Sequence, residues 1–167
     1  DTECALSESY EEIVSSKGWR IWATNFHTVS WWKWAVNELE LYSDIDCTNI
    51  IPNDSGTVFD SGHGSSSGVP EKAFGQSGIW AGRKDSNNLF YIGKMFDSDV
   101  ELRCVKLLNK SANAAVNEIR VQAYNENEDS WENAWIEKAL DTSENAWNKI
   151  QMLHTPGPTE PPTEQPT

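Results

Sequence analysis

The middle of the chain consists of short apolar runs separated by segments rich in Gly, Ser, Asn and Asp. Runs this short are typical of β-strands, whereas a helix needs a longer stretch with a period of about 3.6 residues. A chain of 167 residues has room for one domain of about 140 to 150 residues and not for two. We therefore predict one all-β, antiparallel domain. Its strands are expected at residues 19–23, 32–42, 57–59, 89–96, 100–108, 116–124, 131–136 and 147–153.

Two stretches leave more than one interpretation of their geometry. Trp34 and Val36 have one parity and Leu39 and Leu41 the other, so burying all four requires a β-bulge near Asn37. Residues 131–153 contain aromatic and leucine residues that also approximate helical spacing. Two strands are favoured there, because the neighbourhood is β-rich and Asp-Thr-Ser at 141–143 is typical of a turn; a helix is the alternative.

The two ends of the chain differ from its middle. Ser9 and Glu12 form a capping-box pattern, and with Tyr10, Ile13 and Val14 they predict a short helix within residues 6–17. Residues 155–167 read TPGPTEPPTEQPT, a Pro/Thr-rich tract without apolar residues, which is typical of a disordered linker or glycosylated stalk to other domains of a longer parent chain. The expected organisation is therefore an N-terminal extension (1–17), a β domain (18–154) and a linker (155–167).

Charge and cysteine content limit the function classes. The chain has 26 acidic and 13 basic residues and a net charge of −13, which repels nucleic acid and disfavours a membrane surface. Cys4, Cys47 and Cys104 lack zinc or CxxC spacing, so one disulfide with a leftover cysteine is the better interpretation. Asn53 and Asn109 each begin an N-glycosylation sequon. Together these features predict a secreted, extracellular glycoprotein.

No catalytic arrangement stands out. Residues 64–68 match the G-x-S-x-G nucleophile elbow in letters, but they lie in a Gly/Ser-rich segment followed by Pro70 rather than between a strand and a helix. His27, His63 and His154 have no spacing that would bring two to one metal ion, and none has a carboxylate and serine placed for a catalytic triad. We expect that the protein is not an enzyme.

Several motifs follow one another in the order found in a known family. The chain resembles the coagulation-factor type C, or discoidin-like, domains over about residues 18–153. The resemblance implies a jelly-roll β-sandwich of the galactose-binding-like type, whose end loops bind glycans, phospholipid head groups or proteins. The matching segments are residues 18–21 (GWRI), 34–44 (WAVNELELYSD), 73–75 (AFG), 80–82 (WAG), 91–96 (YIGKMF), 100–105 (VELRCV) and 116–122 followed by Trp131.

The resemblance also bears on calcium and on the cysteines. Many family members hold a structural calcium ion near a turn that contains an Asp, and residues 73–80 are shorter here and lack that Asp. A structural calcium ion stays an expectation, with Asp44 and Asp46 as its candidate ligands. The resemblance implies a Cys47–Cys104 disulfide, which would join two distant parts of the sandwich. The alternative is a Cys4–Cys47 disulfide with Cys104 buried as a small apolar residue.

The candidate ligand residues lie on two loops. A sugar site combines an aromatic platform with planar hydrogen-bonding groups, and residues 25–32 and 80–88 supply both. The predicted ligand-binding residues are His27, Trp31, Trp32, Arg83 and Asn87.

The remaining tryptophans and the function complete these expectations. Trp34, Trp80, Trp131 and Trp147 are expected in the core. The predicted function is a carbohydrate-binding, adhesion-type module that recognises a glycan or cell-surface glycoprotein. A protein-interaction or structural domain without a sugar site is the second hypothesis, and phospholipid head-group binding is the third.

Overall fold

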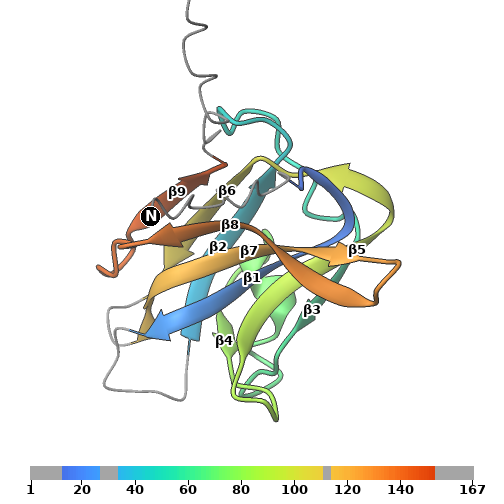
Figure 1. Ribbon diagram of the computed structural model, residues 1–167. Coiled ribbons are helices and arrows are strands. Elements are labelled where there is room, and N and C mark those ends of the chain that lie inside the picture. Colours follow the sequence, from blue (N-terminus) through green and yellow to red (C-terminus); the bar gives the residue numbers. More distant parts are fainter. Residues whose placement is uncertain (1–12, 27–33, 111–113, 153–167) are drawn as a thin grey trace, which may run out of the picture.

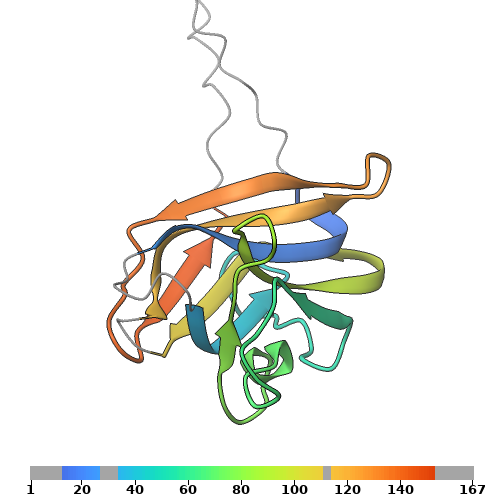
Figure 2. The ribbon, with the colours of Figure 1, turned by 90° about the horizontal axis from the view of Figure 1, so that it is seen from below.

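The computed structural model describes residues 13–26, 34–110 and 114–152, and these ranges form two antiparallel β-sheets. The strands are β1 (Ser15–Phe26), β2 (Trp34–Tyr42), β3 (Thr57–Asp60), β4 (Trp80–Gly82), β5 (Phe90–Glu101), β6 (Cys104–Asn109), β7 (Val116–Asn125), β8 (Ser130–Lys138) and β9 (Trp147–Gln151), with a 3₁₀ helix η1 (Pro70–Ala73). One sheet has the order β3-β5-β1-β7-β8 and the other β4-β2-β6-β9. They stack as two layers around one apolar core (Figures 1 and 2), so the predicted all-β sandwich is confirmed.

The strands agree with the sequence pattern except at three places. β1 begins at Ser15, so residues 15–17 are strand and not the end of the predicted helix, and the sheet extends into the expected N-terminal extension. The single strand predicted over residues 100–108 is divided, because β5 ends at Glu101 and β6 begins at Cys104. The short β4 was not predicted, since three residues carry little periodicity. Two strands over residues 131–153 are confirmed, and the helix alternative is wrong.

The bulge predicted at Asn37 is present. The register between β2 and β6 shifts between Val36 and Glu38. As a result Trp34 and Val36 before the shift and Leu39 and Leu41 after it are all buried, the most exposed of them at 4 %. The extra residue therefore reverses the parity of the strand without exposing an apolar side chain.

Two fully buried tryptophans lie at the centre of the core. Trp34 begins β2 and Trp80 begins β4, and their rings meet edge to face with centroids 5.2 Å apart. Both were expected in the core. The Trp80 indole N–H donates to Asp60 Oδ2 at 2.8 Å, which satisfies a polar group that burial would otherwise penalise.

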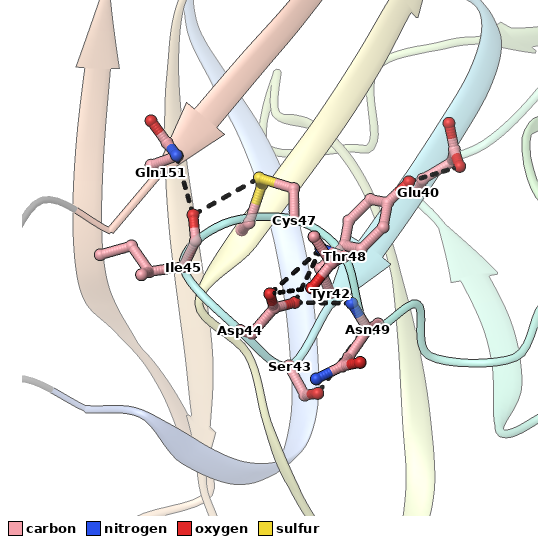
Figure 3. Close-up of a disulfide and its surroundings, with 10 residues drawn as sticks. Glu40, Tyr42, Ser43, Asp44, Ile45, Cys47, Thr48, Asn49 and Gln151 are labelled. Carbon is pink, nitrogen blue, oxygen red and sulfur yellow. Dashed lines mark hydrogen bonds between the residues drawn. A yellow bond between two sulfur atoms is a disulfide. The ribbon is translucent and has the colours of Figure 1, made fainter.

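A disulfide joins the turn that follows β2 to the start of β6. Cys47 and Cys104 are bonded with their Cα atoms 5.5 Å apart, and both are buried (Figure 3). The predicted pairing is confirmed and the Cys4–Cys47 alternative is wrong; Cys4 lies outside the described residues. A disulfide is compatible with an oxidising compartment. In the described part of the chain, no helix is long and apolar enough to cross a bilayer.

Candidate functional site

The solvent-facing side of the five-stranded sheet carries aromatic rings and planar polar groups. Alternation along β1 and β7 sends Trp19, Ile21 and their neighbours into the core and the intervening side chains outward. Pairing aligns Phe59, Gly93, Arg20, Gln122 and Asn133 in one row across all five strands. We call this surface the arginine–aromatic face. It consists of Arg20, Trp22, Phe59, Tyr91, Arg120, Gln122, Tyr124, Trp131 and Asn133.

Arg20 lies at the centre of this face, between two rings. Its Cζ is 4.6 Å from the centroid of the Tyr91 ring and 4.7 Å from that of Trp131. Its Nε donates to Gln122 Oε1 at 2.6 Å. Burial lowers the pKa of Arg20, but a guanidinium stays charged at any physiological pH. The rings flank the guanidinium group and Gln122 accepts from Nε, so the two terminal nitrogens have no hydrogen-bond partner among the described residues.

The hydrogen bond from Arg20 orients two amides in turn. Gln122 Oε1 accepts the hydrogen bond from Arg20 Nε, so the Gln122 Nε2 faces Asn133 and donates to Asn133 Oδ1 at 3.0 Å. The exposed Asn133 therefore presents its own amide N–H groups. The row ends in hydrogen-bond donors and suits a ligand rich in acceptors.

A second arginine stands on the neighbouring strand. Arg120 Cζ lies 5.3 Å from the centroid of the Trp22 ring, and these two residues are paired between β7 and β1. Arg120 Nε is buried and has no hydrogen-bond partner among the described residues. Such an orphaned donor is unusual in a folded protein, because losing water without gaining a partner costs free energy.

Gly93 and Phe59 shape the part of this face that lies over β5 and β3. Gly93 sits between Phe59 and Arg20 in the row, and a Cβ there would lie 2.1 Å from the Trp19 carbonyl oxygen. β5 and β1 can therefore approach closely only because Gly93 has no side chain. Phe59 closes the aromatic group, with its ring centroid 5.5 Å from that of Trp131.

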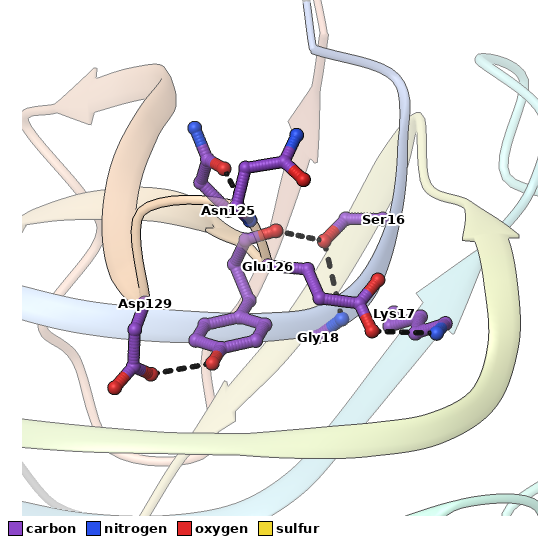
Figure 4. Close-up of polar contacts among 8 residues, drawn as sticks. Ser16, Lys17, Gly18, Asn125, Glu126 and Asp129 are labelled. Atoms are coloured by element: carbon purple, nitrogen blue, oxygen red, sulfur yellow. Dashed lines mark hydrogen bonds and ion pairs between the residues drawn. The ribbon is translucent and has the colours of Figure 1, made fainter.

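The β7–β8 hairpin is tied to the start of β1 (Figure 4). Ser16 Oγ donates to the Tyr124 carbonyl oxygen at 2.7 Å, and Lys17 Nζ contacts Glu126 Oε1 at 2.7 Å. The Tyr124 hydroxyl donates to Asp129 at 2.5 Å, and its ring lies 5.3 Å from that of Trp131. These contacts hold Trp131 against Arg20.

The predicted loop site is only partly within the described residues. His27, Trp31 and Trp32 lie outside them. Arg83 and Asn87 are both exposed on the segment between β4 and β5. The Asn87 backbone N–H donates to Asp85 Oδ1 at 2.8 Å, so Asp85 organises the turn. The Asp85 carboxylate lies near enough to raise the pKa values of Tyr91 and Arg20, in each case as a smaller effect than burial.

The candidate calcium ligands are engaged in a turn (Figure 3). The Asp44 carboxylate accepts hydrogen bonds from Thr48 N, Thr48 Oγ1 and Asn49 N, at 2.6 to 3.1 Å. The bond from the Thr48 hydroxyl is the largest cause of the lowered pKa of Asp44. Asp46 is exposed. Among the described residues, no group of three His, Cys, Asp or Glu side chains is placed to hold a metal ion.

A lysine ammonium occupies a cluster of backbone carbonyls beside the turn at residues 73–80. Lys94 is 1 % exposed, and its Nζ donates to the carbonyl oxygens of Asn53 and Ser55 at 2.7 and 2.9 Å. The same nitrogen lies 4.6 Å from the centroid of the Phe74 ring. Burial lowers the pKa of Lys94. The chain itself thus supplies a cation at this position.

The two sequons differ in accessibility. Asn53 is exposed, and its glycosylation stays a prediction. Asn109 is fully buried, and its Nδ2 donates to the Asp141 carbonyl oxygen at 2.6 Å. A glycan attached to that nitrogen would break this bond and has no space, so the structure contradicts Asn109 as an acceptor in the folded protein.

Asp60 and His63 form a pair that the sequence did not predict. His63 Nδ1 lies 2.9 Å from Asp60 Oδ2, the oxygen that also accepts from Trp80. Among the described residues no serine hydroxyl bonds to His63; Ser65 and Ser67 bond to each other. Residues 64–68 lie between β3, which ends at Asp60, and the 3₁₀ helix η1, so no strand leads directly into them and no α-helix follows, as a nucleophile elbow requires.

Two tryptophans expected in the core lie at the surface. Trp131 is half-buried on the arginine–aromatic face, and Trp147 is 50 % exposed on β9. Trp131 follows the turn that ends β7, and the alternation of residues 116–124 directs Arg120, Gln122 and Tyr124 away from the core. Extending that parity to Arg20 and Trp22 on β1 would have indicated the face. The contributions of Phe59, Tyr91 and Asn133 depend on sheet order, which has no local signal.

Comparisons with known proteins return nothing for this chain. A scan against protein-family models found no match, and searches of curated proteins and of solved structures also found none.

Proposed function

We propose that the protein is a carbohydrate-binding module of the galactose-binding-like, jelly-roll type, and that it holds its ligand on the arginine–aromatic face. The observation that carries the proposal is the combination of half-buried rings with planar polar groups on one solvent-facing side of a sheet. Sugars offer an apolar C–H face and a rim of hydroxyls. Rings such as Trp131 and Trp22 suit the first, and Arg20 and Asn133 suit the second.

The setting proposed for this module is outside the cell. The disulfide favours an oxidising compartment, and the exposed Asn53 sequon and Pro/Thr-rich residues 155–167 are typical of secreted, multidomain proteins. Single sugar sites bind weakly, so adhesion to a cell surface or matrix would use several copies in a parent chain. The proposed role is recognition without catalysis.

The test is a glycan array probed with the full chain and with single variants. Trp131→Ala removes a ring from the face, and Trp147→Ala removes an exposed ring from the other sheet as a matched control. We expect Trp131→Ala to lose at least about 10-fold in affinity, since stacking and buried area are lost, and Trp147→Ala to bind normally. Melting temperatures of both variants establish that they are folded.

One outcome would change the location of the proposed site, and another would refute the proposed function. Loss of binding in Arg83→Ala with normal binding in Trp131→Ala would move the site to the loop residues predicted from sequence. Silence of the folded protein on all glycans would refute carbohydrate binding.

A protein-interaction module is the second candidate. Ile136 on β8 and Trp147 on β9 are 46 % and 50 % exposed, on the edge strands of the two sheets. Exposed large apolar side chains at sheet edges are frequent in protein interfaces. Capture of a partner protein that Trp147→Ala abolishes, with no glycan bound, would favour this function. Phospholipid head-group binding is the third candidate, and the net charge of −13 weighs against it.

A further inference from the structure

Resting on the function proposed above, we propose that the saccharide recognised by the arginine–aromatic face is acidic, and that its carboxylate binds between Arg20 and Arg120. The two arginines lie on neighbouring strands and point to the same side of the sheet. Arg20 pairs with Gln122, and Arg120 pairs with Trp22, so the two are diagonal neighbours. Diagonal positions in an antiparallel sheet are about 7–8 Å apart, a span that one carboxylate between two guanidinium groups can bridge.

Within the described part of this strongly acidic protein, neither arginine forms an ion pair, and Asp85 acts on Arg20 only from beyond ion-pair distance. The chain carries twice as many acidic as basic residues, 26 against 13. The ion pairs among the described residues involve Lys17, His63 and Arg103, and none involves Arg20 or Arg120. Glu118 projects near Arg120 on β7, but its carboxylate accepts from the Thr24 hydroxyl at 2.7 Å. With acidic groups abundant, two unpaired neighbouring arginines on one face indicate a site for an external anion.

The unused donors are arranged for a planar anion. The rings of Tyr91 and Trp131 flank the Arg20 guanidinium, and Gln122 engages Nε, so its terminal nitrogens form the open edge. Arg120 Nε is buried without a partner in the described part of the chain, so Arg120 would meet a ligand through its terminal nitrogens. A carboxylate accepts two parallel N–H bonds from a guanidinium edge, and these charge-assisted bonds are stronger than neutral ones.

The overall charge favours a sparsely charged ligand over a polyanion. A chain of net charge −13 repels a densely sulfated polymer or an anionic membrane over a distance of about 8 Å at physiological ionic strength. A saccharide with an isolated carboxylate meets two positive charges at the face and brings little further charge. Its neutral hydroxyls can accept from the amide of Asn133, and its apolar ring face can stack on Trp131 or Trp22.

The test uses ligand pairs that differ in charge. Titration calorimetry with the full chain compares sialyllactose with lactose, and trigalacturonate with its methyl ester; sulfated lactose is a separate arm. We expect the acidic member of at least one pair to bind 10-fold or more tightly than its neutral partner. Arg20→Gln and Arg120→Gln should each reduce that ratio to below 3-fold. Arg103→Gln is the control, because Arg103 is half-exposed and paired with Glu101.

Each result bears on one of the two proposals. Equal affinity for acidic and neutral partners, or a preference that survives both variants, would overturn the acidic assignment and leave carbohydrate binding standing. Tighter binding of sulfated lactose than of either carboxylate ligand would overturn the choice of a carboxylate. Absence of binding to every saccharide would overturn both proposals. Two variants are used so that misfolding of one still leaves a measurement from the other.

Discussion

The disulfide between Cys47 and Cys104 allows a quantitative test of how the sandwich is stabilised. The perturbation is the double substitution Cys47→Ala with Cys104→Ala, compared with the intact disulfide. Alanine is chosen because Cys104 is fully buried and Cys47 is 5 % exposed, so serine would bury a hydroxyl without a partner. Both proteins also carry Cys4→Ala, which removes the third thiol and prevents disulfide exchange.

The magnitude follows from the length of chain that the disulfide closes. Cys47 and Cys104 are 57 residues apart in sequence. In the chain-entropy model, closing a loop of that size removes about 14 cal/mol/K from the unfolded chain, which is about 4 kcal/mol at 25 °C. A domain of this size has a total stability of about 5–15 kcal/mol, so the loss is a large fraction of it.

The assay is equilibrium unfolding in urea, followed by tryptophan fluorescence. We expect the free energy of unfolding of the double variant to fall by about 3–5 kcal/mol, with the midpoint moving to lower urea. A decrease of less than about 1 kcal/mol would refute the reasoning, since it would mean that the unfolded chain gains little freedom without the bond. Wild-type protein treated with reductant should reproduce the variant.

Three further predictions concern the core, the β1–β5 contact and pH. Trp34→Ala should cost about 3–5 kcal/mol in urea unfolding, because the ring is fully buried and packs on Trp80, and a cost below about 2 kcal/mol would contradict this packing. Gly93→Ala should cost about 1–3 kcal/mol, because its Cβ would meet the Trp19 carbonyl, whereas Gly64→Ala meets only the flexible Arg83 side chain and should be near neutral; equal melting temperatures would refute this. Burial, and then the hydrogen bond to Glu40, raise the pKa of Tyr42 from 10.0 to about 12. The stability that this shift contributes is therefore complete below pH 10 and is lost as the pH rises toward about 12. Glu40→Gln should lower the midpoint of the Tyr42 titration, measured by absorbance at 295 nm with Tyr42→Phe as the control that identifies the Tyr42 signal. An unchanged midpoint would refute the role of Glu40.

Sequence patterns predicted the features that depend on strand parity. The bulge at Asn37 followed from the opposite parities of Trp34 and Leu39, because only an extra residue buries both. The Cys47–Cys104 pairing depended on the family resemblance, since spacing alone left the alternative with Cys4 open.

Features that depend on sheet order were not predictable. Trp131 and Trp147 have the apolar character of core residues, but each lies on an edge strand, where one side of the ring has no neighbouring strand to cover it. The meeting of Phe59, Arg20 and Asn133 in one row requires knowing that β3 and β8 lie at opposite edges of the same sheet. A single sequence contains no local signal for such long-range pairing.

The Lys94 ammonium binds the carbonyl oxygens of Asn53 and Ser55, so the segment around these residues is held in place without a bound metal ion. A dissolved metal ion leaves a site when its concentration falls, but a charge attached covalently to the backbone cannot diffuse away. The segment around residues 53–55 therefore stays fastened to β5 in fluids poor in divalent ions. Burial makes this amine give up its proton at a lower pH than an ordinary lysine, so alkaline solution removes the charge at this position.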